Sequence, residues 1–556
     1  MSRILEARRC RRGAMHSRRS VQCVMLVSLL TAPLARAAAQ IPPAPLPLSV
    51  TEDARTLPRG MVRLRGLTAW TRFDNVYGGL GDTASGARQL GELFSAPHLG
   101  PDQIPSLSSA QTALRALTGN AALRLDAGQL TTTADSRIVT IPLTLEYGLT
   151  DHLTIGVTLP VVQTTSNTVI QLNPRAWPDI GVNTGPNPAL FSGNSSARAT
   201  NLAVYNALSR AHADLTDALA ACPNPTSTVC SQPDAARQAQ ALSDSYRVAV
   251  QTLYGTDPAH PGSPFVPLGA VQTMVNQQLA ALDVTLQALL GQSYLTSTPT
   301  GAAAKAALDQ LQQLLTNPAG IAFDSLGSPT EIGIGDVEVS AALRLFDGFA
   351  DTTRTGWQAR AAIRGVLRLG TGKPADGLVA FAIGTGTGQT SADGAAVLEV
   401  RLPARVLVTL LGQYTAYFGS APVHRVPGDN YSLFPLDVPI QGTWRAGNTV
   451  QIEATPRYLL SDYFTLHGNY TIRRQAGSTY TSPDLTTAPL FEPTTEQRIG
   501  FGFAYSTLAR YARRRASVPF EAFFTQMQTI AASGGLTPRY TRTQLEFRIY
   551  YRLRRR

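Results

Sequence analysis

Residues 145–162 read LEYGLTDHLTIGVTLPVV, and this stretch decides the fold. Apolar side chains alternate with polar or small ones on both sides of a short polar turn, 148–152. Before the turn, Leu145 and Tyr147 fall on one face and Glu146 on the other. A repeat of period two predicts strands with one polar and one apolar face, here joined as a hairpin. The question is whether the apolar face meets a protein core or lipid.

The same alternation recurs along the chain and predicts about twelve strands. Each segment is close to the ~10 residues that cross a bilayer as a tilted strand. The expected strands lie near 62–72, 137–148, 152–163, 335–346, 357–370, 391–402, 405–417, 448–459, 463–474, 496–508, 517–528 and 541–553.

The connections between these segments alternate strictly in length. Short turns follow every second strand, at 148–151, 347–356, 403–404, 460–462 and 508–516. The other connections are long: 73–136, 164–334, 371–390, 418–447, 475–495 and 529–540. An even number of strands with short and long connections in turn is the topology of an outer-membrane barrel, with the N-terminus on the periplasmic side. A soluble sandwich has no reason to alternate in this way.

The polar faces and the strand ends favour lipid over a dry core. The polar faces carry charges that a dry sandwich core would not tolerate unpaired. Aromatic residues stand near strand ends, as interfacial girdles require: Tyr147, Phe346, Tyr417, Phe418, Tyr458, Tyr463 and Phe464. The sequence therefore predicts an all-β fold, a transmembrane antiparallel up-and-down barrel of about twelve strands, whose apolar face meets lipid and whose polar face lines a lumen.

Composition and charge agree with an envelope protein. The chain has 556 residues, of which 44% are hydrophobic and 15% charged, against about 25% charged in ordinary soluble domains. The net charge of +11 includes eight Arg and one Glu in the first forty residues, so removing that +7 leaves +4. A charge this small gives no argument for a nucleic-acid partner.

The N-terminus reads as a secretory signal peptide over residues 1–39. Arg18 and Arg19 precede the apolar stretch 24–34 and a small-residue cleavage tract, 35–39. Translation from Met15 instead of Met1 gives a signal of ordinary length. No later apolar run reaches the ~18 residues of a transmembrane helix. We expect a periplasmic segment over 40–60, the barrel over 61–163 and 335–556, and localisation in the outer membrane.

The connection 164–334 differs in composition from the strands and predicts a helical insertion. Leucines recur at helical spacing in three stripes: Leu202, Leu208, Leu215 and Leu219; Leu279, Leu282, Leu286 and Leu289; and Leu308, Leu311 and Leu315. The parity of the strands makes the insertion extracellular, as a loop or a plug. Cys222 and Cys230 are expected to form a local disulfide, because exported cysteines are usually oxidised.

Enzymatic chemistry finds little support in the sequence. Of six His residues after the signal, only His467 projects inward from a strand, where it fits a polar network in the lumen. Ser461 lies at the opposite end of that strand, and no Gly-x-Ser-x-Gly stands near. No spacing suggests a metal or a phosphate-binding loop. We expect no enzyme, no metal and no cofactor.

The inward charges are the candidate functional residues. They are Glu146, Asp336, Glu338, Arg344, Arg360, Arg364, Arg368, Glu399, Arg401, Glu453, Arg457, His467, Arg473, Glu546 and Arg548. One interpretation is a cross-strand ion-pair ladder that stiffens a narrow barrel. The other is a conduit biased towards anions, because the arginines of 357–370 have no equal acidic run.

Three motifs carry a resemblance to a known family. They are the turn 147–160, the sequence Gly-Ile-Gly-Asp-Val at 333–337 and Leu-Gly-Thr-Gly at 369–372, with a weaker copy of the turn at 458–466. Together they resemble outer-membrane β-barrel proteins of the phenol meta-pathway degradation and transporter-like family. The helical insertion and the ending Leu-Arg-Arg-Arg at 553–556 depart from that pattern.

The resemblance implies uptake of aromatic or other hydrophobic compounds. With the lumen charges, it leads us to expect passive or gated passage of small molecules, aromatic, hydrophobic or anionic, with outer-membrane lipid and a small solute as partners. The alternative is a structural or surface-display barrel whose helical insertion binds a partner.

Overall fold

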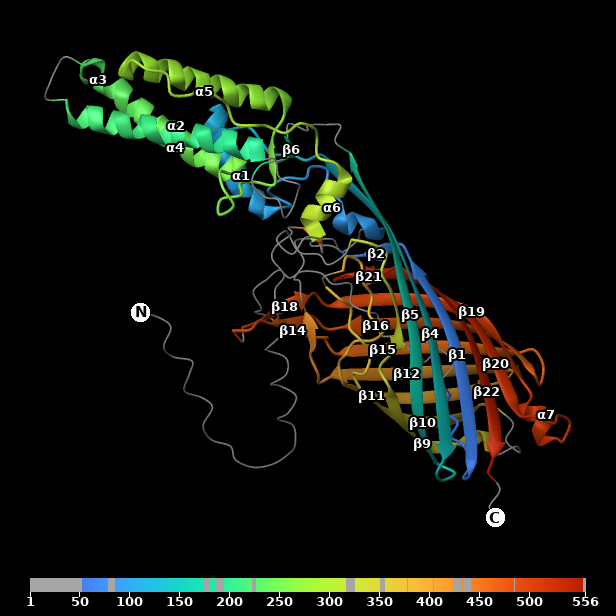
Figure 1. Cartoon of the computed structure of the whole chain (residues 1–556). Coiled ribbons are helices and arrows are strands. Elements are labelled where there is room, and N and C mark those ends of the chain that lie inside the picture. Colours follow the sequence, from blue (N-terminus) through green and yellow to red (C-terminus); the bar gives the residue numbers. More distant parts are fainter. Residues whose placement is uncertain are drawn as a thin grey trace, which may run out of the picture. The chain divides into compact units, whose positions relative to one another are not determined.

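The computed structural model describes residues 53–78, 86–173, 180–183, 185, 195–222, 227–316, 326–350, 356–377, 379–403, 405–423, 432–434, 442–484 and 486–553. Twelve long strands dominate it (Figure 1). They are β1 (Met61–Phe73), β4 (Gln129–Gly148), β5 (Leu153–Asn173), β9 (Glu338–Asp347), β10 (Gln358–Arg368), β11 (Ser391–Leu402), β12 (Val406–Tyr417), β15 (Thr449–Leu459), β16 (Phe464–Gln475), β19 (Thr494–Ser506), β20 (Phe520–Ser533) and β22 (Thr541–Arg552).

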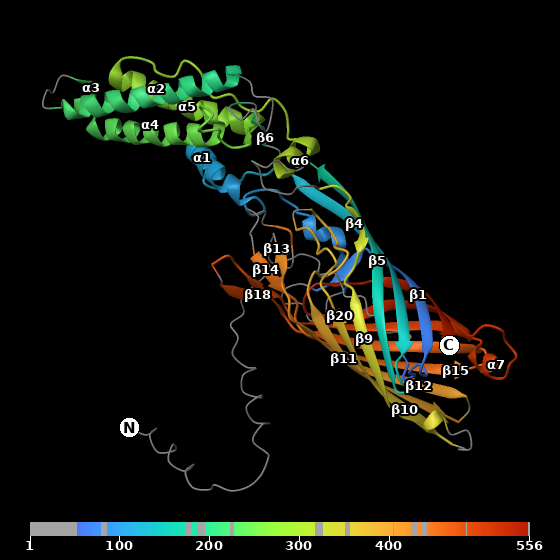
Figure 2. The same ribbon diagram turned by 60° about the horizontal axis from the view of Figure 1, so that its bottom comes forward.

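These strands form a closed antiparallel ring. Each pairs with its neighbours in chain order, and β1 pairs with both β4 and β22, which closes the sheet on itself. Two views show the strands side by side around the wall (Figure 1, Figure 2). A closed ring satisfies every backbone group within the sheet, which is the condition for crossing lipid with strands. The predicted twelve-stranded barrel is confirmed.

The two faces of the wall have opposite chemistry. In the deciding hairpin, Leu145 is 57% exposed and Val157 50% exposed, whereas Thr144 and Thr158 are buried inside and their hydroxyls are hydrogen-bonded at 2.9 Å. Large apolar side chains are exposed in the same way on all the barrel strands, among them Leu64, Ile363, Leu410, Ile452, Phe501 and Ile549. Such a continuous apolar outer surface is unfavourable in water and matches a hydrocarbon layer.

The hairpin of β4 and β5 is longer than expected. β4 begins at Gln129 instead of 137, and β5 continues to Asn173 instead of 163. The added part remains fully paired, from Gln129 opposite Asn173 inward. On β4 its outward positions are polar, and Arg137 marks the change from the apolar belt that starts at Val139. The apolar pattern therefore marked the part that faces lipid, not the whole strand.

The fourth predicted strand is broken near its start. The expectation that it begins at 335 is wrong, because β9 starts at Glu338 and a separate strand, β8 (Thr330–Ile334), precedes it. β8 pairs with β5 over Val161–Thr165, and β9 pairs with β5 over Leu153–Thr158. At the break, the amide of Gly335 donates to the carbonyl of Pro160 (2.8 Å). A Gly-Asp pair allows the chain to leave the ladder there.

The described part of the insertion is mainly helical. Its helices are α2 (Ser195–Ala220), α3 (Thr228–Ser231), α4 (Pro233–Tyr254), α5 (Gly269–Leu290) and α6 (Leu308–Thr316), with the short strands β6 (Ile180–Val182) and β7 (Phe265–Pro267). The leucine stripes predicted α2, α5 and α6, and they are buried apart from Leu202 and partly exposed Leu219 and Leu308. α4 was not predicted, because it buries small residues such as Ala236 and Ala239. Cys222 and Cys230 form a disulfide.

Further short elements belong to the long connections. Helix α1 (Ser108–Thr118) packs against α4 and α5. One small sheet contains β13 (Ala421–Val423), β14 (Gly442–Arg445), β17 (Ser478–Thr481) and β18 (Thr487–Phe491); another contains β2 (Asn75–Tyr77), β3 (Arg88–Gln89) and β21 (Thr537–Pro538). The remaining helices are η2 (Leu90–Phe94), η3 (Pro105–Leu107), η4 (Gly348–Ala350) and α7 (Leu508–Ala512). Across the described ranges, no helix is long and apolar enough to span a membrane. The signal peptide lies outside the described residues.

Candidate functional site

The lumen collects most of the candidate residues. Buried side chains are those of Glu146, Asp336, Glu338, Glu399, Glu453, His467, Arg473, Glu546 and Arg548. Partly buried ones are those of Arg344, Arg360, Arg364, Arg368 and Arg457, whereas Arg401 is exposed. Because period-two strands turn alternate side chains inward, the apolar outer face of each strand fixes which charges enter the lumen.

One wall of the lumen carries a continuous run of ion pairs near the short-turn end. Arg63 of β1 pairs with Glu146 of β4. Arg65 lies 3.7 Å from Glu146 and 2.9 Å from Glu546 of β22. Glu546 is also 2.7 Å from Arg548. Charges alternate along this wall, so each buried guanidinium lies against a carboxylate.

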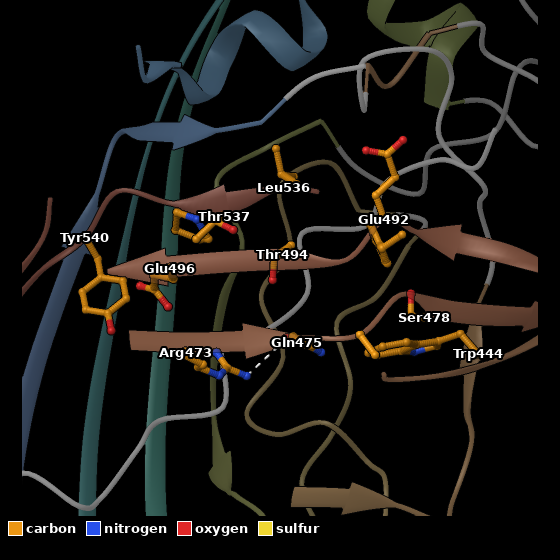
Figure 3. Close-up of a pocket in the computed structure, with 13 residues that line it drawn as sticks. Trp444, Arg473, Gln475, Ser478, Glu492, Thr494, Glu496, Leu536, Thr537 and Tyr540 are labelled. Atoms are coloured by element: carbon orange, nitrogen blue, oxygen red, sulfur yellow. Dashed lines mark hydrogen bonds between the residues drawn. The ribbon is translucent and has the colours of Figure 1, made fainter. Parts of the chain in front are cut away.

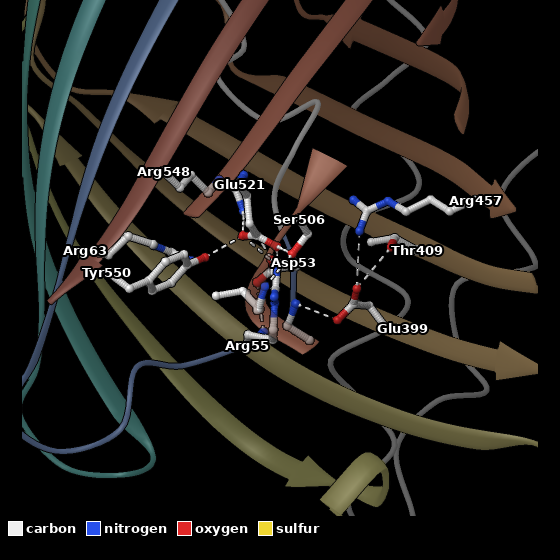
Figure 4. A network of polar contacts seen from close by, with 12 residues as sticks. Asp53, Arg55, Arg63, Glu399, Thr409, Arg457, Ser506, Glu521, Arg548 and Tyr550 are labelled. Atoms are coloured by element: carbon white, nitrogen blue, oxygen red, sulfur yellow. Dashed lines mark hydrogen bonds and ion pairs between the residues drawn. The ribbon is translucent and has the colours of Figure 1, made fainter. Parts of the chain in front are cut away.

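The run continues into the chain that precedes β1. Asp53 lies 3.3 Å from Arg548, and Arg55 is 2.6 Å from Asp53. Arg55 also lies 3.1 Å from Glu521 of β20, and the hydroxyl of Tyr550 donates to the same carboxylate (2.5 Å). Figure 4 shows Asp53 and Arg55 inside the ring among these side chains. Residues 53–57, here called the lumen segment, therefore enter the barrel.

The lumen segment also contacts the opposite wall. The amide of Ala54 donates to a carboxylate oxygen of Glu399 on β11 (3.0 Å). Glu399 pairs with Arg360 and lies 3.7 Å from Arg457. Thr409 donates to it as well (3.3 Å). β11 and β22 are separated by half of the ring, so the lumen segment spans from one wall to the other.

Two further bonds hold the lumen segment close to the first turn. The amide of Leu57 donates to the hydroxyl of Thr154 (2.8 Å), and the hydroxyl of Thr56 donates to the carbonyl of Asp151 (3.0 Å). Ala54 packs with Ala362, Val397 and Leu411 in a small apolar cluster. The lumen segment thus crosses the interior of the barrel near the short-turn end, from β22 to β11.

Two arginines of β10, Arg360 and Arg368, form ion pairs with carboxylates on the neighbouring strands. Arg368 lies 2.7 Å from Glu338 and 3.3 Å from Asp393, and Arg360 pairs with Glu399. Arg364 lies between them and is partly buried. These contacts are the cross-strand pairs of the first interpretation.

Two further candidates, Arg344 and Arg401, contact residues outside these ion pairs. Arg344 pairs with Asp347 at 3.1 Å. The guanidinium of Arg401 stands over the ring of Phe349, 4.6 Å from its centroid. These contacts lie near the short-turn end of the strands.

The inward side chains of the middle strands form neutral contacts. His467 is within 3.0 Å of the hydroxyl of Thr525, and Glu453 accepts from Thr455 (3.2 Å). Arg473 donates to Gln475 (3.2 Å).

The carboxylate of Asp336 is hydrogen-bonded to the connection between β10 and β11. Its carboxylate accepts from the amide of Gly372 (2.9 Å) and from the amide and hydroxyl of Thr387 (2.8 Å each). It lies in the break between β8 and β9, at residues 335–337, which belong to no strand. Its contacts hold the connection 369–390 against that break.

Sequence reasoning missed several charges of the lumen. Asp53 and Arg55 stand in a segment with no periodicity, which was expected to be periplasmic. Arg63, Arg65 and Glu521 lie on predicted strands, and the alternation of those strands could have found them. Within the described ranges, no group of three His, Cys, Asp or Glu side chains is placed to hold a metal ion.

Known structures with a similar fold are outer-membrane and transport proteins. The COG4313 outer membrane channel from Pseudomonas putida F1 aligns over 90% of this chain and 98% of its own, at 9% identity and a TM-score of 0.38. The CymD monoaromatic hydrocarbon channel aligns over 89% and 90%, at 9% identity and a TM-score of 0.26. The P. putida toluene transporter TodX aligns over 90% and 92%, at 11% identity and a TM-score of 0.25. No protein-family model and no curated protein matches the sequence.

Proposed function

We propose that this protein is an outer-membrane channel for small solutes, gated by the lumen segment. The closed ring with an apolar outer surface supports the membrane location, because that surface needs lipid and the ring leaves no strand edge exposed. The ring encloses a polar interior, which is the usual environment of a solute path.

The observation that carries the gate is the path of residues 53–57 from wall to wall. The segment belongs to no strand of the ring, and it is held by hydrogen bonds and ion pairs to the wall and the first turn and by the small apolar cluster around Ala54. Contacts of this kind can break and reform without opening the ladder of the barrel. A segment that crosses the lumen and is held by separable contacts supports gated rather than free passage.

The pairing of the lumen carboxylates with guanidiniums favours passage over catalysis. Near the lumen segment, Glu146, Glu399, Glu521 and Glu546 each lie against at least one guanidinium. A general base or a nucleophile needs a group that is available to the substrate. The paired carboxylates of this region support a structural and electrostatic role instead.

The test compares the mature chain with a form that lacks residues 40–58. Both are refolded into liposomes, and swelling in a neutral sugar and single-channel conductance are measured. We expect the shortened form to pass solute faster and to stay open longer, because the lumen segment is gone. Arg59→Gln serves as the control, since Arg59 is exposed just beyond the segment.

Heat-modifiable migration on a detergent gel verifies that each form contains a folded barrel. No passage in either folded form contradicts the channel. That result favours the alternative, a structural or surface-display barrel whose helical insertion binds a partner.

A further inference from the structure

A pocket opens at the long-loop end of the barrel, far along the strands from the lumen segment. It is lined by the end of β16, the start of β19, the small sheet of β14, β17 and β18, and the connection before β22; the lining includes Trp444, Arg473, Ser478, Phe491, Glu496 and Tyr540.

The two ends of this pocket differ in chemistry. Figure 3 shows Arg473, Glu496 and Tyr540 together at one side and Trp444 with Ser478 at the other. Trp444 and Phe491 are buried, and both contribute to the lining. The pocket therefore combines an aromatic side, where the exposed Glu492 also contributes to the lining, with an end that contains Arg473, Glu496 and Tyr540.

The charged end has an excess of positive charge. Arg498 lies 2.8 Å from Glu496, which also accepts from the hydroxyl of Thr529 (3.1 Å). Arg473 and Arg542 have no carboxylate within 4.0 Å in the described chain; Arg473 donates to Gln475 and Arg542 donates to Thr71. Three guanidiniums thus share one directly paired carboxylate.

Tyr540 connects this cluster to the pocket. The guanidiniums of Arg498 and Arg542 stand over its ring, 5.4 Å and 4.9 Å from the ring centroid. Its hydroxyl is buried and finds no hydrogen-bond partner among the described residues, and the same holds for the hydroxyl of Ser478. Nε and Nη1 of Arg498 and Nη1 of Arg542 are also without partners there.

Buried donors without acceptors are costly, each by about 1–3 kcal/mol. Of these groups, the hydroxyls of Tyr540 and Ser478 line the pocket, and the guanidiniums of Arg498 and Arg542 adjoin it at the ring of Tyr540. An anion in that space would supply acceptors to the hydroxyl of Tyr540 and to Arg473 and would offset the excess charge of Arg498 and Arg542. Guanidiniums match planar carboxylates especially well.

We propose that this pocket binds a small aromatic carboxylate at the outer mouth of the channel, with its carboxylate at Arg473 and Tyr540 and its ring at Trp444 and Phe491. The inference rests on the proposed function, for which it names the solute class. A monocyclic ring stacks on aromatic side chains, and the carboxylate determines the orientation at the charged end. The site is where the long connections meet the lumen, so it selects solutes before the lumen segment is reached.

The test uses benzoate as the probe and benzamide as its neutral match. Binding to the folded, detergent-purified full chain is measured by calorimetry. We expect benzoate to bind at least tenfold more tightly than benzamide, which corresponds to about 1.4 kcal/mol. Added KCl should weaken benzoate binding and leave benzamide unchanged, because salt screens only the charged partner.

Variants identify the residues. Arg473→Gln should reduce benzoate affinity about tenfold or more and leave benzamide unaffected. Tyr540→Phe removes only a hydroxyl without a partner, so it should fold normally and weaken benzoate binding several-fold. Arg513→Gln is the control, because Arg513 is exposed in the turn before β20 and pairs with Asp462. It should bind benzoate as the native chain does.

Equal affinity for benzoate and benzamide overturns the proposal, and so does native benzoate affinity in Tyr540→Phe. Passage measured on the same preparations separates this proposal from the channel itself. If a neutral sugar passes but benzoate does not bind, the pocket assignment fails and the channel stands. If benzoate binds but no form passes solute, the channel fails and the site stands.

Discussion

The amide of Ala54 and the carboxylate of Glu399 are hydrogen-bonded at 3.0 Å although 345 positions separate them in the chain. Glu399 is completely buried and also lies against Arg360 and Arg457. It therefore ties the lumen segment to the wall while it balances two guanidiniums. Its removal affects both roles at once.

Replacing Glu399 with Gln should lower the heat stability of the barrel. The change leaves two partly buried guanidiniums without their common counter-charge, and losing one partner of a buried pair costs about 3–5 kcal/mol. The temperature at which the folded band disappears on a detergent gel measures the effect. Glu331→Gln is the control, since Glu331 pairs with the exposed Lys373. Equal midpoints for both variants would show that the pairs at Glu399 contribute little.

Arg542 and Arg548 give a matched pair on one strand. Both are 1% exposed, but Arg548 lies against Glu546 and Asp53, whereas Arg542 has no carboxylate within 4.0 Å in the described chain. Arg548→Gln should lower the melting temperature, because it leaves the buried carboxylates of Glu546 and Asp53 without the charge of Arg548. Arg542→Gln should raise it, because a desolvated charge without a counter-charge is removed. Shifts of the same sign in the two variants would contradict this account.

The disulfide of the insertion should be dispensable for the barrel. Cys222→Ser with Cys230→Ser should leave heat-modifiable migration unchanged, because both residues stand outside the ring. The loop that the disulfide closes is short, so its loss should destabilise the insertion by about 2–3 kcal/mol. Protease sensitivity between α2 and α4 measures that loss. Labelling of either thiol in the native chain without reductant would contradict the disulfide.

Acid should loosen the end of helix α5. Burial raises the pKa of Asp283, but hydrogen bonds from the hydroxyl of Ser293 and the amides of Leu295 and Tyr294 outweigh it and hold that pKa below its usual value. A carboxyl with a lowered folded pKa stabilises above its unfolded pKa, and the contribution is lost as pH falls through the folded pKa. Proteolysis near 291–296 should therefore rise below about pH 4. In Asp283→Asn, cleavage should be high already at neutral pH and depend little on acid.

The sequence predicted the ring because lipid imposes a strict pattern on the outer face. Each strand that meets hydrocarbon must expose apolar side chains at every second position, as Leu143, Leu145 and Tyr147 do, so all twelve strands were found. Beyond the lipid this constraint ends. Thr131, Thr133 and Asp135 face outward on the added part of β4, so no apolar repeat predicts that part of the strand.

The site was less accessible to sequence reasoning than the ring. Alternation places Glu399 and Arg360 inward, but their pairing depends on the register of β10 with β11. The lumen segment has neither alternation nor helical spacing, so nothing local brings Asp53 beside Arg548. The pocket lining comes from β16, β19 and three long connections, and only the folded chain brings Trp444 and Tyr540 to one space.

Closure of the ring by β1 and β22 has a consequence for biogenesis. β1 pairs with β22, so the ring cannot close until the residues of β22, which follow those of every other barrel strand, have been made. Until they arrive, β1 and β20 both offer unpaired edges, which are prone to aggregate. An incomplete ring therefore exposes two strand edges at the position that β22 fills, and the pairing of β22 with β1 and β20 removes both.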